Sequence, residues 1–186
     1  MALRPVLQFP DKRLKEKSQP IVEIDDELRA LAQDMLDVMY DEPGIGLAAP
    51  QLGASVRLVV VDTDWTDEDA EKNPMVAVNP EIVAREGKIT WTEGCLSVPD
   101  FSADVERAEK ITLRYTDLES ATHEVEAEGL RAVCFQHEID HLDGILFIDH
   151  ISRLKRNLYV QKRKKALRRE AEETDERVTS APGTKL

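Results

Sequence analysis

The segment most informative about the fold is Leu130-Arg-Ala-Val-Cys-Phe-Gln-His-Glu-Ile-Asp-His-Leu142. It is apolar around much of a helical circumference, and Gly144 follows it as a helix stop, which predicts a buried helix over about 130–142. Short β-type runs, each bounded by Gly, Pro, Asn or Asp, precede it at 57–62, 75–79, 88–92, 111–115 and 123–128. Few gaps between these runs could hold a crossover helix, which favours antiparallel pairing. The sequence therefore predicts an α+β fold, with small antiparallel sheets packed around a buried central helix.

An amphipathic helix is predicted before these runs, at 25–40. Its apolar side chains recur on one helical face, at Leu28, Leu31, Ala32, Met35, Leu36 and Met39. Asp25 suits the N-terminus of this helix, and Pro43 ends it.

The C-terminal part of the chain predicts a third helix, at about 152–172. The residues after it are small and polar, so we expect a flexible tail at 173–186. We expect one domain, 1–172, that includes the C-terminal helix.

Composition and charge narrow the class of protein. The chain has a net charge of −12 and only two cysteines, which excludes a disulfide scaffold and favours a reducing cytosol. The apolar runs are short, so no segment is expected to span a membrane, and the first residues do not resemble a secretory signal. We therefore expect a cytoplasmic protein without membrane contact.

The sharpest chemical signal lies inside the predicted central helix, at His137-Glu-Ile-Asp-His141. In this H-E-x-x-H pattern, positions i and i+4 share one helical face, so both imidazoles can point at one metal ion. Glu138 can then act on water as a general base. The alternative is an accidental spacing on an exposed turn, but apolar neighbours make unpaired imidazoles and carboxylates costly there.

A catalytic site of this kind needs a third protein ligand, and the sequence offers several. Cys95, Cys134 and a downstream carboxylate or histidine are candidates. Cys134 lies about 10.5 Å from His141 along a helix axis, at ~1.5 Å per residue, which favours reading it as a buried apolar residue. The extended zincin pattern fails, because Phe147 stands where its third histidine would be.

The segment Gly44-Ile-Gly-Leu-Ala-Ala-Pro-Gln51 contains a second pattern, G-x-G-x-x-A. This is the relaxed dinucleotide fingerprint, but that motif must follow a strand and open a helix. Here a helix precedes it and Pro50 interrupts it. A tight segment that approaches a ligand closely, with the Gln51 amide as a donor at its end, explains it better.

Together, three segments resemble the signature motifs of bacterial-type peptide deformylase, in the order of that family. They are Gly44–Gln51, Glu93-Gly-Cys-Leu-Ser97 and Gln136-His-Glu-Ile-Asp-His-Leu-Asp-Gly144. The resemblance implies hydrolysis of the N-formyl group from the N-terminal formylmethionine of nascent polypeptides, with release of formate. Two alternatives stay open: a zinc peptidase, and a non-catalytic relative that binds metal.

The resemblance also implies roles for individual residues. Cys95, His137 and His141 would be the metal ligands, Glu138 the acid/base, and Gln51 with the Leu96 backbone N–H the donors to the formyl oxygen. One divalent ion is implied, Fe(II) in the first place, with zinc or other divalent ions able to substitute.

For the substrate, the resemblance implies a methionine pocket formed by Ile45, Trp91, Leu130, Cys134 and His137, with Gly46 bonding an extended peptide. The resemblance also implies that Arg107 takes part in substrate binding. It further implies that Arg107 pairs with Asp140 behind the helix that carries His137 and His141. Trp91 and Ser102 depart from residues common in relatives. Some relatives use a basic C-terminal helix to contact the ribosome, so the basic residues of 153–169 make the ribosome a candidate partner. The alternative is a solvated helix face that packs on the acidic body of the protein.

Overall fold

The computed structural model describes residues 3–65 and 70–180. Its contacts divide the chain into two compact units, 1–150 and 151–186. The first unit contains two sheets and two longer helices, α1 (Asp26–Asp41) and α2 (Gly129–Leu142), while the second contains α3 (Arg153–Ser180). Among the described residues, no helix is long and apolar enough to cross a membrane.

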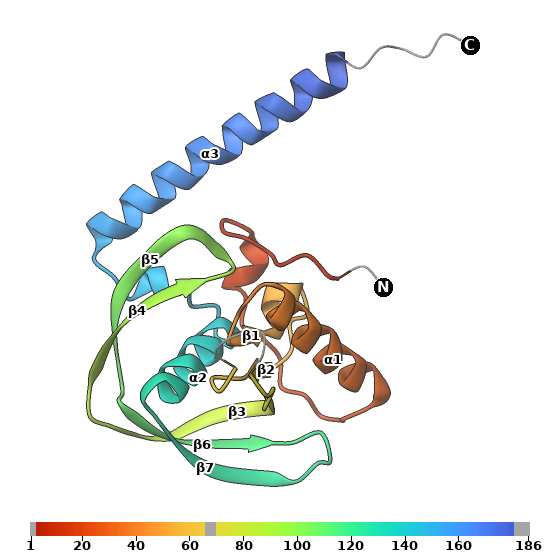
Figure 1. The fold of residues 1–186 in the computed structure, drawn as a ribbon, viewed down its shortest axis with the longest axis vertical. Helices are drawn as coiled ribbons and strands as arrows, with labels where there is room; N and C mark the ends of the chain where they lie inside the picture. Colours follow the sequence, from red (N-terminus) through yellow and green to blue (C-terminus); the bar gives the residue numbers. More distant parts are fainter. Residues whose placement is uncertain (1–2, 66–69, 181–186) are drawn as a thin grey trace. The chain divides into compact units, whose positions relative to one another are not determined.

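The larger sheet has five strands in the order β1-β2-β3-β6-β7, and all neighbouring pairs are antiparallel. These strands are β1 (Gly46–Ala48), β2 (Leu58–Val61), β3 (Met75–Glu86), β6 (Lys110–Thr116) and β7 (Thr122–Glu128). A separate two-stranded sheet pairs β4 (Ile89–Cys95) with β5 (Val98–Arg107). Figure 1 shows α2 between the two sheets. The predicted α+β class, with small antiparallel sheets around a central helix, is confirmed.

Strand β2 shows how the core is built on both faces of the larger sheet. All four of its residues are buried. Val59 and Val61 belong to the cluster that includes Phe135 of α2, whereas Leu58 and Val60 belong to the cluster around α1. Successive side chains of a strand point to opposite faces, so this apolar run joins both helices to one sheet.

Helix α1 follows its predicted pattern. Its N-cap is Asp25, whose side chain accepts a hydrogen bond from the Leu28 N–H at 2.8 Å. The predicted apolar positions belong to the α1 cluster, and Met35 and Met39 are fully buried. The helix ends at Asp41, just before Pro43.

Helix α2 is buried along most of its length. It ends at Leu142, and Gly144 follows with φ of 72°. A Cβ at Gly144 would lie 2.5 Å from the Lys15 carbonyl oxygen, so both the left-handed backbone and the close packing require glycine. This end of α2 is the part of the helix that carries His137 and His141.

Three short helices connect these elements: η1 (Lys12–Lys15), η2 (Ala49–Leu52) and η3 (Phe147–Asp149). Helix η2 continues directly from β1 and contains Gln51. Helix η3 follows α2 and places Phe147 in the core.

Helix α3 is longer than expected. The predicted end at about residue 172 is wrong, because the helix continues to Ser180, through residues expected to form a flexible tail. The physical reason is that Glu and Arg, frequent up to Arg177, favour helix, and the first strong breaker is Pro182. The rest of the expected tail, 181–186, lies outside the described residues. The domain boundary predicted at residue 172 stays a prediction.

Candidate metal and active site

Three side chains from two elements converge at the centre of the first unit. His137 and His141 come from α2, and Cys95 is the last residue of β4. Each offers one ligand atom, and the three atoms lie within 4.8 Å of one another. The Cys95 Sγ lies 3.3 Å from the His141 Nε2. One thiolate and two imidazoles are a donor set suited to a divalent transition metal.

Cys95 reaches the helix because of an irregularity in the β4–β5 pair. The register joins Gly94 to Ser102 but Cys95 to Val98, so β5 bulges between these two pairs. Asp100, inside the bulge, has a φ of 58°. Bulges re-aim side chains at the ends of strands, and this one turns the tip of the hairpin toward α2.

Glu93 determines how His137 presents its ring. The Nδ1 of His137 lies 2.8 Å from a Glu93 carboxylate oxygen, which can only accept, so Nδ1 carries the proton and Nε2 is left for a metal. Phe147 stacks on the same ring at 6.1 Å between centroids. Sequence reasoning missed this role of Glu93, although the residue opens one of the three motifs.

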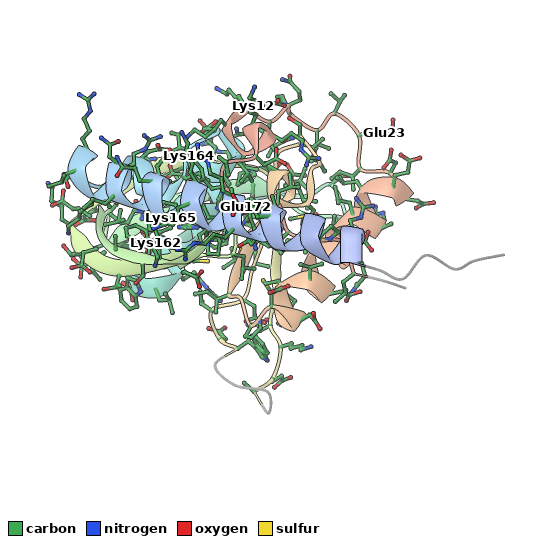
Figure 2. All side chains as sticks on the ribbon, turned by 90° about the horizontal axis from the view of Figure 1, so that it is seen from above. Lys12, Glu23, Lys162, Lys164, Lys165 and Glu172 are labelled. Carbon is green, nitrogen blue, oxygen red and sulfur yellow. The ribbon has the colours of Figure 1, made fainter. Side chains whose placement is uncertain are left out.

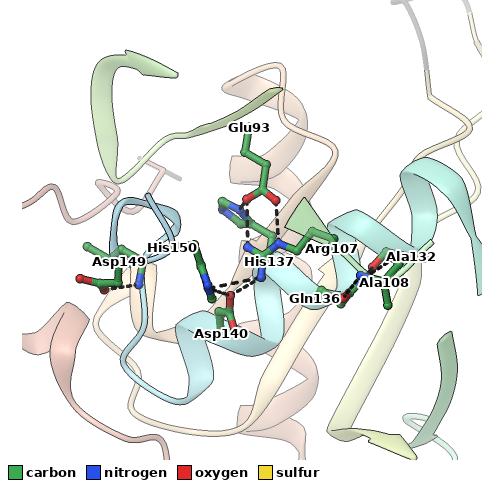
Figure 3. Close-up of polar contacts among 10 residues, drawn as sticks. Glu93, Arg107, Ala108, Ala132, Gln136, His137, Asp140, Asp149 and His150 are labelled. Atoms are coloured by element: carbon green, nitrogen blue, oxygen red, sulfur yellow. Dashed lines mark hydrogen bonds and ion pairs between the residues drawn. The ribbon is translucent and has the colours of Figure 1, made fainter. Parts of the chain in front are cut away.

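Arg107 lies behind α2 and links Glu93 to Asp140. Its guanidinium donates to both Glu93 oxygens, at 2.7 and 3.0 Å, and to Asp140 at 2.5 Å (Figure 3). The predicted pairing of Arg107 with Asp140 is confirmed. Burial would raise the pKa of Glu93, but the hydrogen bonds from Arg107 and His137 outweigh it and lower that pKa to about 2. Glu93 therefore stays an acceptor for His137.

Gln136 fixes α2 to the neighbouring backbone from the same side. Its amide nitrogen donates to the carbonyl oxygens of Ala108 and Ala132, both at 2.9 Å, and its amide oxygen accepts from the Ala108 N–H at 2.9 Å (Figure 3). The residue before His137 is thus tied to the strand connection that carries Arg107.

Glu138 is buried beside the ligand group with an unsatisfied carboxylate. Its Oε2 has no hydrogen-bond partner among the described residues, and neither has the Nδ1 of His141. Burial raises the pKa of Glu138 to about 7. Burial also lowers the pKa of His141 well below its usual value, which keeps this imidazole neutral as a ligand must be. These orphaned polar atoms fit a site that receives a metal and water.

Gly46 allows β1 to approach Glu138. A Cβ at Gly46 would lie 2.6 Å from the Glu138 Oε1 and 2.7 Å from the Cys134 Sγ, closer than side chains pack. The Cys134 thiol donates to the Ile45 carbonyl oxygen at 3.5 Å, and burial raises its pKa well above the usual value. Cys134 therefore stays a thiol at the wall of the site, and the ligand group contains Cys95 instead.

Gln51 reaches the ligand group from the other side. Its amide oxygen accepts from the Ala48 N–H at 2.8 Å, which fixes the amide so that its nitrogen faces the β4–β5 hairpin. That nitrogen lies 3.2 Å from the Ser97 Oγ and 3.7 Å from the Cys95 Sγ. The amide is buried and orientated, as a donor to a developing charge should be.

These groups open into a cleft of about 480 Å³. Its walls are the Gly44–Gly46 segment, the β4–β5 hairpin and one face of α2. Among the described residues, β1 pairs in its sheet only with β2, so its other edge is left for an extended chain.

Residues 3–157 match the family model described as polypeptide deformylase. The chain belongs to the polypeptide deformylase family. It is 49% identical over 170 residues to a peptide deformylase of Rhodopseudomonas palustris (strain BisB5), covering 91% of this chain and 97% of that protein. It is 52% identical over 168 residues to one of Alkalilimnicola ehrlichii, covering 90% and 93%. The crystal structure of a peptide deformylase from Legionella pneumophila superposes with a TM-score of 0.83 at 45% identity, covering 91% and 98%.

The predicted family is therefore confirmed, and the chain is a deformylase, an enzyme that removes the N-formyl group from nascent peptides. Deformylases depend on a metal, and the group of Cys95, His137 and His141 is a possible site for it.

Most of the residues that were predicted to bind substrate line the cleft. The lining includes Ile45, Gly46, Trp91, Leu130, Cys134 and His137. Leu96 and Gln51 line it as well. Trp91 keeps 37% of its surface exposed there.

One residue predicted to bind substrate, Arg107, does not reach the cleft. Its side chain is instead buried against Glu93 and Asp140. The physical reason is that all three guanidinium nitrogens already donate to the carboxylates of Glu93 and Asp140, which holds the side chain behind α2. Ser102 is exposed on β5, opposite Gly94, and is also absent from the lining.

Proposed function

We propose that this chain is a cytoplasmic enzyme that hydrolyses the formyl group of N-terminal formylmethionine with Cys95, His137 and His141 as its metal ligands. The observation that carries the proposal is the unsatisfied Glu138 carboxylate beside three convergent ligand atoms. A structural metal site would be closed by a fourth protein ligand, whereas the described residues supply three. A zinc peptidase is disfavoured by the polypeptide deformylase match.

The donor set fits one divalent cation, which we propose to be Fe(II), with zinc as a substitute. Such an ion supplies Lewis-acid chemistry, because it lowers the pKa of water and polarises a carbonyl oxygen. The chain's own part is to keep His141 neutral and to orient the ring of His137, whose Nδ1 donates to Glu93.

Glu138 moves the protons of the reaction. With its pKa raised to about 7 by burial, its carboxylate can take a proton from the attacking water near neutral pH. The same carboxyl then gives this proton to the leaving amine, which releases formate and a free N-terminus. Both transfers need an oxygen without a competing hydrogen bond, and Oε2 is such an atom.

Gln51 and the Leu96 backbone stabilise the negative charge that develops on the formyl oxygen. The Gln51 amide is orientated by the Ala48 N–H, which holds its nitrogen on the side of the β4–β5 hairpin, beside Cys95. Leu96 follows the ligand Cys95 at the tip of the hairpin and lines the cleft.

The substrate peptide extends along the free edge of β1. Gly46 offers backbone groups there, and the methionine side chain enters the pocket of Ile45, Leu130, Cys134 and Trp91. Trp91 lines this pocket from β4.

The first prediction is fast formate release from a short formyl-Met peptide by protein prepared without oxygen. We expect one equivalent of iron per chain, loss of activity with a chelator, and recovery with Fe(II) or more weakly with zinc. The same peptide without its formyl group should not be cleaved. Inactivity of folded protein loaded with Fe(II), or cleavage of the unformylated peptide, would contradict the proposal.

Helix α3 is proposed to contact ribosomal RNA. Lys162, Lys164 and Lys165 are exposed on it (Figure 2). Clustered Lys side chains bind phosphates with a strong dependence on salt.

As a test, Lys164→Glu/Lys165→Glu should lower co-sedimentation with ribosomes at low salt several-fold, because two phosphate contacts become repulsive. Hydrolysis of a short formyl peptide should stay unchanged. Lys12→Glu/Lys17→Glu, with the same charge change in the first unit, is the matched control. Equal binding by the two double variants would argue against a role of α3.

A further inference from the structure

A short turn after α2 contacts the proposed ligand His137 through one residue and Asp140, behind that ligand, through another. Helix η3 places Phe147 on the ring of His137, with 6.1 Å between centroids and 25° between planes. His150 follows η3, and its backbone N–H donates to the Phe147 carbonyl oxygen at 3.0 Å. Asp149 anchors the turn, because it accepts from the Leu146 N–H at 2.9 Å and pairs with Lys15 at 2.5 Å. These contacts fix the backbone from which the His150 side chain extends.

The His150 ring is hydrogen-bonded to Asp140. Its Nε2 lies 2.7 Å from an Asp140 carboxylate oxygen. Arg107 lies 3.4 Å from the same nitrogen, but a nitrogen cannot donate to Asp140 and accept from Arg107 at once. Because the ionised carboxylate only accepts, and its contact is the shorter one, the proton belongs on Nε2 and His150 is the donor.

From Asp140 the hydrogen bonds continue inward to a metal ligand (Figure 3). The same Asp140 oxygen accepts from Arg107, Arg107 donates to both oxygens of Glu93, and Glu93 accepts from His137. Arg107 and Glu93 are buried, whereas the His150 side chain keeps 36% of its surface exposed. The chain of contacts thus connects the protein surface with the ligand ring.

The geometry points to His150 as a positioning residue of the metal site, which acts through Asp140, Arg107 and Glu93 on the orientation of His137. Without the His150 donor, Asp140 is held by Arg107 alone, and its carboxylate, 20% exposed, can turn toward water. The guanidinium is a rigid planar fork, so a tilt that follows Asp140 displaces both of its bonds to Glu93. Glu93 then holds the Nδ1 of His137 less firmly.

This inference rests on the proposed ligand set but not on the proposed reaction, so its test reads the metal directly. His150→Leu removes the donor and keeps bulk, while His150→Gln retains an N–H near the place of Nε2. His123→Leu is the matched control, because the His123 Nε2 pairs with Asp117 at 2.5 Å, at similar exposure, on the distant strand β7. All variants are loaded with Co(II), and the thiolate-to-cobalt absorption and the rate of chelator-driven metal loss are measured.

We expect His150→Leu to shift the cobalt spectrum and to speed metal loss by about 3- to 10-fold. This is at or below the effect usually seen when a residue hydrogen-bonded directly to a metal ligand is replaced, because His150 acts at a greater distance. His150→Gln should stay within about twofold of the parent, and His123→Leu should match the parent in both readouts. Equal metal loss and equal spectra for His150→Leu and His123→Leu would overturn the inference. So would a His150→Gln variant that behaves like His150→Leu. A parent protein that binds cobalt without thiolate absorption would instead contradict the proposed ligand set.

Discussion

Replacing Glu138 with alanine is expected to reduce formate release by about 10²–10⁴-fold, while the protein keeps its fold and its metal. The reason is that, among the described residues that line the cleft, Glu138 is the buried carboxylate with an oxygen free of hydrogen bonds, whereas Asp100 is exposed to solvent. Glu93, which also lines the cleft, is engaged by Arg107 and His137, and these contacts lower its pKa to about 2. Turnover is measured as formate per unit of bound metal, so that metal loss is separated from lost chemistry.

Glu138→Gln is the control for shape. It conserves the volume of the side chain but cannot carry the proton, so its activity should fall as far as that of the alanine variant. Activity within about tenfold of the parent in either variant would show that another group accepts the proton.

Gly46→Ala is expected to lower the rate of formate release by about 10²-fold, because displacing a catalytic group by about 1 Å typically has an effect of that size. The added methyl would lie 2.6 Å from the Glu138 Oε1 and 2.7 Å from the Cys134 Sγ, so the carboxylate or strand β1 must shift. Both neighbours are buried on α2, which leaves the carboxylate little room. The measurement is the rate of formate release, together with thermal unfolding.

Gly44→Ala provides the comparison for this variant. A Cβ there meets its nearest atom, the Met39 carbonyl oxygen, at 3.4 Å, which is an ordinary contact, so the rate should change by less than about threefold. A double-mutant cycle locates the cause: Gly46→Ala should destabilise the Glu138→Ala protein less than the parent, because one clash partner is gone. Equal destabilisation in both backgrounds would place the clash elsewhere.

The fold was predictable where the sequence pattern is local. Helices α1 and α2 follow their periodicity, and their predicted ends agree with the structure within a residue or two. Strands β1 and β5 were missed. Strand β1 has three residues, and β5 contains Pro99, Asp100 and Asp104, which are unfavourable in strands, so its pairing depends on β4 rather than on its own composition.

The candidate site was predictable where a motif carries it. Spacing within one helix brings His137 and His141 together, and the resemblance selected Cys95 among the candidates for the third ligand. The hydrogen-bonded chain behind them was only partly foreseen, since its Arg107–Asp140 link was expected but Glu93 and His150 were not. Its members come from β4, β5, α2 and the turn after α2, and no local pattern encodes a contact between such distant segments.

The placement of Cys95 has a consequence for folding. Two of the possible ligands share one stiff helix, whereas the third stands at the tip of a separate two-stranded ribbon, 46 positions from His141 in the chain. An ion held by all three is therefore a cross-link that closes a long loop, in the manner of a disulfide but without a covalent bond. Anything that binds the native chain and not the unfolded one stabilises it, by about 2.7 kcal/mol at one hundred times the dissociation constant. Catalytic activity and stability against unfolding then both depend on one equilibrium, the binding of the ion to its three ligands. Substitutions that destabilise the β4–β5 ribbon should therefore lower both.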